Sequence, residues 1–481
     1  MSKDNRRDFL KKSIAAGSLF AIGGTQSKVL GANDTIRMAV SGIHGRGKSH
    51  MNAFQGMDNV EVVALVDPDA SLFASRSKMI TDKGGKSPLC FQDIRKAMEW
   101  KDLDGLSIAT TNHWHSLQAI YACQNGKDVY VEKPCSHNVF EGRILAEAAR
   151  KYNRIVQHGT QSRSSGGWWR LAELVKKGVY GKLLISRGLV YKRRKSIGFA
   201  ENETPPKSLS YDMWLGPAQD QPYNTNLVHY DWHWFWDFGN GDIGNQGVHQ
   251  MDIARWMIPG ATLPKKVLSL GGRLGYVDQA ETPNTLLSIM DFGETKLIFE
   301  VRGLETDHFF NKGRGNQNTN ILHFEKGVVA NGKFYPGGDI NKPQNLESAD
   351  VELGPGGGHF GNFIAAMRTR KPSDLNAEIL EGHYSSALCH LANISYRVGQ
   401  PVPFNPIQDE VKADKDLMEA YNRMQEHLIK NGVSPDKNAY YMGRELKIDA
   451  KNEQIIDDIE ANHLLTRWYR KPFVVPSKQN V

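Results

Sequence analysis

A chain of 481 residues is too long for one small domain and long enough for two. Hydrophobic residues make up 40% of it and charged residues 23%, as is typical of a globular protein. The first 31 residues carry six Lys and Arg residues but only two acidic ones, so leaving them out reduces the formal charge from +7 to +3. This small excess argues against a nucleic-acid partner.

The first 33 residues have the features of an export signal. Arg6 and Arg7 stand ahead of a Phe-Leu pair, and an apolar run rich in Ala and Gly follows at residues 14–22. That run is shorter than the roughly 20 apolar residues of a membrane span. The segment resembles a twin-arginine signal, which directs folded proteins to an export machinery. We therefore expect residues 1–33 to be a signal peptide, the protein to be periplasmic, and no stable membrane anchor.

Short apolar runs alternate with helical patterns over the next part of the chain. Strands are expected at residues 36–40, 60–66, 105–109, 127–132 and 154–158. Strands that alternate with helices predict a parallel sheet with right-handed crossovers. The fold class is therefore α/β, and residues 34–158 are predicted to form a Rossmann nucleotide-binding domain.

A glycine-rich loop follows the first strand and leads into a helix. It contains Gly42, His44, Gly45, Arg46 and Gly47, and we predict that all five bind a cofactor. Glycines let such a turn tighten and let backbone N–H groups approach a pyrophosphate where the helix begins. A histidine stands at the usual second glycine position, so the two later glycines must allow the close approach.

Asp67 closes the second strand, 25 residues after Gly42. A carboxylate at this place accepts hydrogen bonds from the ribose hydroxyls of the cofactor and repels a 2′-phosphate. The sequence therefore favours NAD. The nearby Arg76 leaves NADP as the less favoured alternative.

The run from Gly126 to Pro134 predicts a catalytic lysine. Its strand ends at Glu132, and Pro134 holds Lys133 in an extended conformation at the carboxyl end of a parallel strand. Such sheets bind their ligands at this edge. An ammonium group there can hydrogen-bond a substrate hydroxyl and stabilise charge on its oxygen.

These motifs, with one more in the second half, resemble a known family. The segment from Gly244 to Trp256 is similar to a D-x-G-x-H-x-x-D pattern that opens a helix, and His115 follows the third predicted strand, at residues 105–109. Over residues 35–405 the chain resembles the Gfo/Idh/MocA (glucose–fructose oxidoreductase, inositol dehydrogenase) oxidoreductases, in an exported subgroup with a twin-arginine signal. The resemblance implies that His115, Glu132 and Lys133 belong to the cofactor site.

The resemblance also implies that Lys133 and His249 are catalytic and lie on either side of the substrate carbon that faces the nicotinamide. An imidazole suits exchange of the hydroxyl proton because its ordinary pKa is near working pH. Asn245 departs from the family, which usually has Asp four residues before the histidine. An amide cannot stabilise an imidazolium as a carboxylate does, so the base is weaker or differently oriented unless Asp242 and Asp252 compensate.

Aromatic and acidic side chains gather at residues 230–238, just before this segment. Aromatic rings stack on the apolar faces of sugars, while polar side chains hold the hydroxyls. We therefore expect a carbohydrate or glycoside substrate. The predicted contacts are Tyr230, Asp231, His233 and Asn245.

The rest of the chain predicts a second domain. Strand-like runs at residues 182–191, 264–271, 285–301 and 321–333 indicate a large, mostly antiparallel open sheet in an α+β domain over residues 159–405. The family resemblance implies that the exposed face of this sheet builds a homo-oligomer. Residues 406–481 are expected to form a tail, helical and then extended. The four cysteines are scattered, so neither a metal site nor a disulfide framework is expected.

Export restricts the chemistry, because no reliable pool of oxidised NAD exists outside the inner membrane. We expect a tightly bound cofactor that is recycled internally, in transhydrogenation, epimerisation or oxidation-assisted glycoside cleavage of a carbohydrate. Two alternatives stay open. The protein is an ordinary NAD(P)-dependent sugar dehydrogenase or ketosugar reductase, or a periplasmic sugar-binding protein without catalysis.

Overall fold

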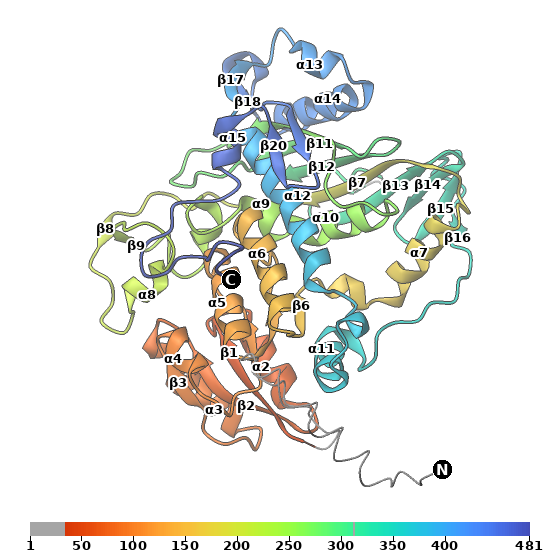
Figure 1. Cartoon of the computed structure of the whole chain (residues 1–481). Helices are drawn as coiled ribbons and strands as arrows, with labels where there is room; N and C mark the ends of the chain where they lie inside the picture. The colour runs from red at the N-terminus through yellow and green to blue at the C-terminus, as the bar shows by residue number, and fades with distance from the viewer. Residues whose placement is uncertain (1–33, 311–312) are drawn as a thin grey trace, which may run out of the picture.

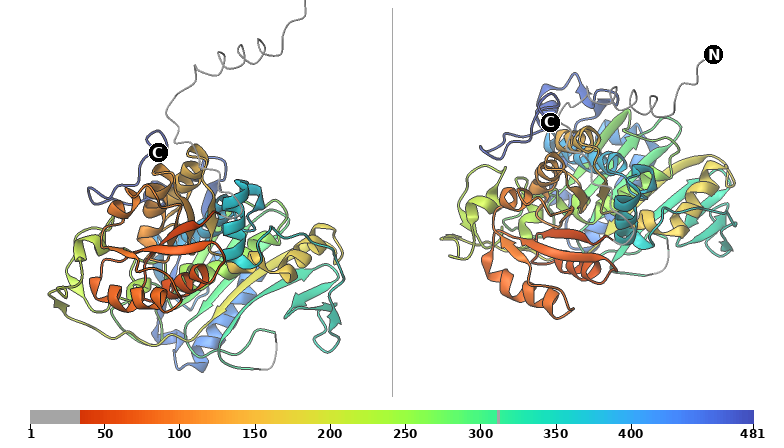
Figure 2. Two further views of the ribbon diagram at one scale, coloured as in Figure 1. Left: turned by 90° about the horizontal axis from the view of Figure 1, so that it is seen from below. Right: turned by 60° about the horizontal axis from the view of Figure 1, so that its bottom comes forward.

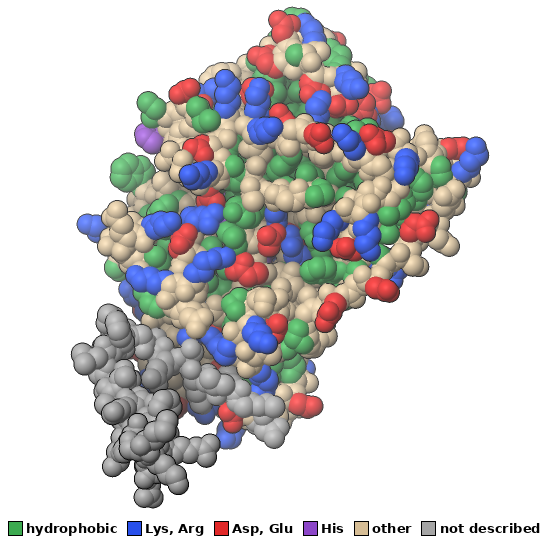
Figure 3. Space-filling model, turned by 45° about the vertical axis from the view of Figure 1, so that its right-hand side comes forward, with side chains coloured by type: hydrophobic (Ala, Val, Ile, Leu, Met, Phe, Trp, Pro, Cys, Tyr) green, Lys and Arg blue, Asp and Glu red, His purple; other side chains and the backbone are tan. Residues whose placement is uncertain are grey.

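The computed structural model describes residues 34–310 and 313–481, and these residues contain two large sheets joined by helices (Figure 1). The predicted signal at residues 1–33 lies outside the described residues. Within them, no helix has the length and apolar character needed to cross a membrane. On the face seen in Figure 3, basic and acidic side chains are interspersed.

The first sheet is parallel, with strand order β3-β2-β1-β4-β5-β6. Its strands are β1 (Ile36–Ser41), β2 (Val60–Val66), β3 (Leu89–Phe91), β4 (Gly105–Ile108), β5 (Asp128–Val131) and β6 (Val156–His158). The strand order reverses between β1 and β4, and ligands of such sheets bind at the carboxyl ends of the strands at this point. The predicted Rossmann fold is confirmed.

Helices cover both faces of this sheet. They are α2 (Gly47–Gln55), α3 (Phe73–Thr81), α4 (Ile94–Met98), α5 (Asn112–Gln124) and α6 (Val139–Lys151). Helix α11 (Gly358–Thr369) returns from the second half of the chain and packs beside β1, which Figure 2 shows from below. The nucleotide-binding half is therefore completed by residues far away in sequence.

The second sheet has the order β16-β15-β14-β13-β7-β12-β11-β10-β18-β17, and β19 and β20 extend it from β10. Its strands are β7 (Leu183–Tyr191), β10 (Lys266–Gly272), β11 (Thr285–Asp291), β12 (Lys296–Arg302), β13 (Gln317–Phe324), β14 (Gly327–Ala330), β15 (Lys333–Pro336), β16 (Gln344–Asn345), β17 (Gln400–Pro403), β18 (Ala439–Met442), β19 (Leu446–Asp449) and β20 (Gln454–Ile456). Within this second sheet, β7–β12 is the only parallel pair among the described residues. The prediction of a mostly antiparallel sheet is therefore confirmed.

Two of the predicted strand runs were too long. Residues 285–301 form the hairpin β11–β12, because Gly293 turns the chain with φ of +93°. Residues 321–333 are divided among β13, β14 and β15. An apolar run alone does not mark such tight turns.

The remaining helices connect and cover the two sheets. They are α7 (Gly166–Lys176), α8 (Tyr211–Leu215), α9 (Gly241–Asn245), α10 (Gly247–Trp256), α12 (Ile379–Arg397), α13 (Asp409–Lys412), α14 (Lys415–Lys430) and α15 (Ile459–His463), with a short hairpin β8 (Asn202–Glu203) and β9 (Tyr223–Asn224). Helix α12 is buried over most of its length between α6, α10 and β10, so it ties the two halves together.

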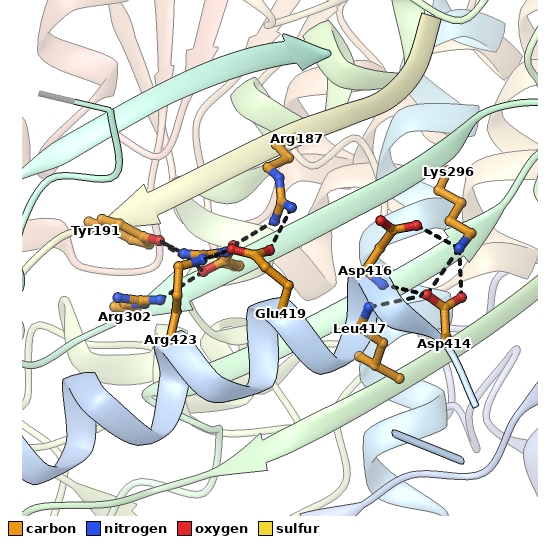
Figure 4. A network of polar contacts seen from close by, with 10 residues as sticks. Arg187, Tyr191, Lys296, Arg302, Asp414, Asp416, Leu417, Glu419 and Arg423 are labelled. Atoms are coloured by element: carbon orange, nitrogen blue, oxygen red, sulfur yellow. Dashed lines mark hydrogen bonds and ion pairs between the residues drawn. The ribbon is translucent and has the colours of Figure 1, made fainter. Parts of the chain in front are cut away.

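Helix α14 of the tail lies on the outer face of the large sheet and is fixed there by charge (Figure 4). The buried carboxylate of Glu300 on β12 accepts from the Tyr191 hydroxyl at 2.8 Å and pairs with Arg187 at 3.3 Å and Arg302 at 3.0 Å. Arg423 of α14 completes the cluster. This helix therefore covers part of the face where a homo-oligomer was expected, and the oligomer itself stays a prediction.

The N-terminal end of α14 is held by a second group of charges. Asp414 caps the helix by accepting from the N–H groups of Asp416 and Leu417 at 2.9 and 3.2 Å. Lys296 of β12 donates to Asp414 at 3.0 Å and to Asp416 at 2.7 Å. Carboxylates at a helix N-terminus are favoured by the helix dipole, so cap and ion pairs act together.

Removing the Glu300 carboxylate tests how strongly α14 is fixed. Burial raises the pKa of Glu300, but Arg423, Arg302 and Arg187 together hold it well below its ordinary value. We expect Glu300→Gln to lower the free energy of unfolding by about 3 to 5 kcal/mol at pH 7, because three guanidinium groups lose their shared counter-charge. Denaturant unfolding measures this change.

The same carboxylate sets a pH dependence. Its pKa in the folded protein is depressed, so its stabilisation is present above the ordinary carboxyl pKa and lost as pH falls toward the folded value. Asp82→Asn, in the exposed pair Lys78–Asp82, is the control and should change stability little. A Glu300→Gln protein as stable as the wild type would contradict the assignment.

Candidate active site

A cleft of about 450 Å³ lies at the carboxyl ends of β1, β2, β4 and β5 and is closed by side chains of the second half. The nucleotide-binding half contributes the loop after β1, the ends of β2 and β5, and the start of α5. The second half contributes residues 229–233 and the α9–α10 segment. This is the position where the strand order predicts a ligand.

The glycine loop has the shape of a phosphate cradle. Gly42 has φ of +80°, and a Cβ there would lie 2.5 Å from the Ala109 carbonyl. A Cβ at Gly47 would lie 2.0 Å from the Gly42 oxygen, so this glycine lets α2 begin directly against the loop, although it does not line the cleft. Gly45 has open space around it. The backbone N–H groups at the start of α2 are therefore accessible to an anion.

Asp67 spans the end of β2 and the glycine loop, and it lines the cleft. Its carboxylate accepts from the N–H of Ile43 and of Asp69, both at 2.9 Å. Burial raises the pKa of Asp67 to about 6, although both backbone hydrogen bonds oppose this shift. Arg76 donates to the carbonyls of Ile43 and His44 at 2.8 and 3.2 Å, so its guanidinium supports the loop.

Lys133 joins the two halves of the cleft. Its ammonium donates to the carbonyl of Asn245, at the end of α9, at 2.9 Å. Burial lowers the pKa of Lys133, while the neighbouring Glu132 raises it. Glu132 accepts from Arg46 at 2.8 Å and contacts the His50 ring at 3.1 Å. Burial alone would raise the pKa of Glu132, but these partners hold it well below its ordinary value.

His115 lines the cleft, but both of its ring nitrogens lie against backbone carbonyls. Its Nδ1 lies 2.6 Å from the Pro134 carbonyl and its Nε2 lies 3.0 Å from the Thr110 carbonyl. The neutral ring carries one N–H, so it donates either to Pro134 or to Thr110 and in both cases is held beside the Lys133-Pro134 turn. The contact of His115 with the cofactor stays a prediction.

His249 stands in the first turn of α10 and lines the same cleft as Lys133. Burial and the charge of Lys133 lower its pKa to about 3. Asp242 and Asp252, which were candidates to compensate for Asn245, are both paired with arginines, although the charge of Asp252 still raises the pKa of His249 slightly against the lowering by burial. Arg194 pairs with Asp242 at 2.5 Å, and Arg163 pairs with Asp252 at 2.9 Å. Among the described residues, the His249 ring has no hydrogen-bond partner, so it stays neutral and open to the cleft.

The aromatic segment supplies one wall, with one exception to the prediction. Tyr230, His233 and Asn245 line the cleft, but Asp231 does not. The Asp231 carboxylate accepts from the Trp234 indole at 3.3 Å, so it supports the segment from behind. His233 stacks on Trp232, with ring centroids 3.6 Å apart. In an irregular segment, the sequence alone does not indicate in which direction a carboxylate side chain points.

Sequence reasoning missed several residues of the cleft. Trp114, Asn112 and Gln118 all line it, and the buried side-chain oxygens of Asn112 and Gln118 have no partner among the described residues. The two amides follow the β4–α5 turn, so their position directly after a Rossmann strand was the signal that could have identified them.

A strap formed by residues 202–229 crosses from the second half to the end of the cleft that holds Asp67. The Ala70 N–H donates to the Ser208 carbonyl at 2.9 Å, and the Ser210 N–H donates to the Pro68 carbonyl at 2.8 Å. At the end of the strap, His229 stacks on His44, with ring centroids 4.2 Å apart and planes within 2°. The strap therefore closes over the glycine loop and was not predicted.

Sequence comparison agrees with this geometry. The Gfo/Idh/MocA oxidoreductase family, described by its NAD-binding Rossmann fold, matches residues 36–160, and the C-terminal alpha/beta domain of the same oxidoreductases matches residues 186–268. The chain belongs to the Gfo/Idh/MocA family. The twin-arginine subgroup stays a prediction.

Individual Gfo/Idh/MocA relatives are distant. A Glycosyl hydrolase family 109 protein of Saccharopolyspora erythraea is 26% identical over 206 residues, which are 38% of this chain and 45% of that protein. Another from Solibacter usitatus is 29% identical over 197 residues, with the same shares. The chain thus spans less than half the length of the curated relatives it matches.

Solved structures share the fold. The WlbA dehydrogenase from Bordetella pertussis, solved in complex with NADH and UDP-GlcNAcA, has 18% identity and a TM-score of 0.54 over 75% of this chain and 95% of its own. An oxidoreductase domain protein from Kribbella flavida has 16% identity and a TM-score of 0.54 over 75% and 96%. In the described part of this chain, no group of His, Cys, Asp or Glu side chains could hold a metal ion.

Proposed function

We propose that this protein is an NAD-dependent oxidoreductase that acts on a carbohydrate hydroxyl and keeps its cofactor through the whole cycle. One observation carries the proposal: Lys133 and His249 come from different halves of the chain and face a single cleft that also holds the glycine loop and Asp67. Each of these groups has a separate task in alcohol oxidation, and the fold places them together.

The cleft fits a dinucleotide. Glycines at positions 42 and 47 leave room where a Cβ would collide with the loop backbone. Asp67 is anchored by two backbone N–H groups and still lines the cleft, as a ribose acceptor requires. Arg76 is engaged with the loop carbonyls, so it is a poor partner for a 2′-phosphate, and we infer a preference for NAD over NADP.

Lys133 and His249 then divide the chemistry. NAD, when bound, supplies a hydride acceptor. Lys133 lies beside Glu132, whose charge raises the pKa of the lysine against the lowering by burial, and the protonated form can donate to the substrate oxygen and stabilise negative charge there. His249 is neutral at pH 7 and can accept the hydroxyl proton, then return it in the reverse step.

A carbohydrate substrate is supported by the walls of the cleft. Trp114, Trp214 and Trp232 offer aromatic faces, and the unpartnered amide oxygens of Asn112 and Gln118 offer acceptors for hydroxyl groups. The curated relatives named Glycosyl hydrolase family 109 proteins favour oxidation-assisted glycoside cleavage as the net reaction. Epimerisation and transhydrogenation use the same two residues.

Retention of the cofactor is supported by the strap. Its hydrogen bonds at Pro68 and Ala70 and the stacked pair His44–His229 cover the loop where the pyrophosphate would lie. A covered cofactor suits a reaction in which the substrate is oxidised and later reduced again. It also suits a protein exported already loaded, which the Arg6-Arg7 pair leads us to propose.

One fractionation experiment tests export and retention separately. We expect the full-length chain, produced in a bacterial host, to reach the periplasm with about one NAD per chain. The double variant Arg6→Lys, Arg7→Lys should remain in the cytoplasm with the same NAD content, since the cleft is unchanged. Wild-type protein confined to the cytoplasm would refute export, and protein purified without nicotinamide would refute retention.

Lys133→Met and His249→Asn should each slow turnover of a glycoside panel at least about a hundredfold, because each removes one proton-handling group. Product analysis by mass spectrometry measures the rate, and bound NAD measured in parallel reports whether the cleft is intact. Lys195→Met, at an exposed position outside the cleft, is the matched control. Turnover like that of the wild type in both cleft variants would overturn the proposed roles.

The pH dependence follows from the pKa of His249. The base must be neutral to accept a proton, and its pKa is lowered to about 3, so single-turnover rates should stay level from pH 8 down to pH 5. Asn245→Asp adds a carboxylate in the same cleft, which favours the imidazolium and should move the acidic limb upward by about one pH unit. A wild-type rate that falls with an apparent pKa near 6.5 would contradict this account.

A further inference from the structure

A second cavity of about 290 Å³ lies near the catalytic cleft and shares no lining residue with it. It forms where α12 and the tail meet the segment that follows η3 (Asp231–Trp234). Tyr230, Trp232 and His233 line the catalytic cleft, whereas Trp236 and Asn240 line the second cavity. One stretch of chain thus contributes to two separate spaces.

Buried polar atoms without partners mark this cavity. Asn393 donates its amide N–H to the Asn240 carbonyl at 2.9 Å, which leaves Asn393 Oδ1 and Asn240 Nδ2 without a partner among the described residues. His390 Nε2 forms a hydrogen bond with the Ser136 hydroxyl at 3.2 Å, and His390 Nδ1 has no partner among the described residues. All three side chains are more than nine-tenths buried. Unpaired buried polar atoms cost free energy unless a ligand or water satisfies them.

Arg467 adds a further donor from the tail. Its terminal nitrogens contact the Asp237 carbonyl at 2.7 Å and the His137 ring at 3.2 Å, and its Nε is buried without a partner in the described chain. The positive charge of Arg467 is offset by the Asp237 carboxylate at 3.2 Å. A second guanidinium, that of Arg397, also lines the cavity, which therefore offers charged donors together with the neutral donor and acceptor atoms of Asn240 and Asn393.

Aromatic surface lies at the same place. Trp468 is 90% exposed, and its carbonyl is held by Gln219 at 2.7 Å. Trp236 is partly buried beneath the Arg397 guanidinium, which lies 4.8 Å from the ring centroid. An indole ring exposed to solvent loses the free energy that burial would provide. Beside unpaired amides it offers a surface on which a ligand can stack.

We propose that this cavity is an accessory binding site for a neutral carbohydrate, one sugar ring in size. Hydroxyl groups donate and accept, so they can satisfy Asn393 Oδ1 and Asn240 Nδ2 together, whereas an anion can satisfy only the donors. The exposed ring of Trp468 supplies a face for the apolar side of the sugar. The volume is close to the lower limit of small-molecule sites. The site does not depend on the redox chemistry of the cleft.

Calorimetric titration with a panel of methyl glycosides tests the proposal on the full chain and three variants. Trp468→Ala changes an exposed side chain and should leave folding intact, and Asn393→Leu removes the unpaired acceptor. His249→Asn marks binding in the catalytic cleft. Besides any binding in the cleft, we expect a binding event that weakens about tenfold in Trp468→Ala or Asn393→Leu and persists in His249→Asn.

The possible outcomes separate clearly. Thermal unfolding checks that each variant is folded. Binding that is lost in His249→Asn and unchanged in both cavity variants would overturn the proposal, because all sugar would then bind in the cleft. No binding of any glycoside to the wild type would also overturn it, and would assign the unpaired atoms to ordered water only.

Discussion

The hydrogen bond from the Lys133 ammonium to the Asn245 carbonyl joins the two halves of the catalytic cleft. The lysine belongs to a strand end that the Rossmann sheet fixes, and the carbonyl belongs to a helix end that the large sheet supports. Because the contact is partly buried, separating the two halves would exchange this hydrogen bond for hydration of the ammonium group. The position of His249 relative to the nucleotide loop is set by this constraint.

Local sequence was sufficient wherever a residue acts through its immediate neighbours. Gly42 and Gly47 were recognisable because one turn brings them together, and Asp67 and Lys133 because each ends a buried strand. The direction of Asp231 was not recognisable, because it lies in an irregular segment whose orientation depends on the packing of Trp234.

Contacts between distant parts of the chain were also beyond prediction. Glu300 and Arg423 are 123 residues apart, and the sequence around either residue does not indicate that the two form a pair. The same holds for the strap, whose hydrogen bonds join Ser208 and Ser210 to the end of β2. A single sequence reveals which side chains carry charge, but the fold decides which of them meet.

The way the tail ends has a consequence for biosynthesis. Phe473 and Val475 are buried in the helical layer of the nucleotide-binding half, where the Phe473 ring meets Trp114 at 5.4 Å between centroids. A core formed largely by residues 39–156 is thus completed by residues that are synthesised much later. The nucleotide-binding half can reach its final packing only after residues 473–475 have left the ribosome.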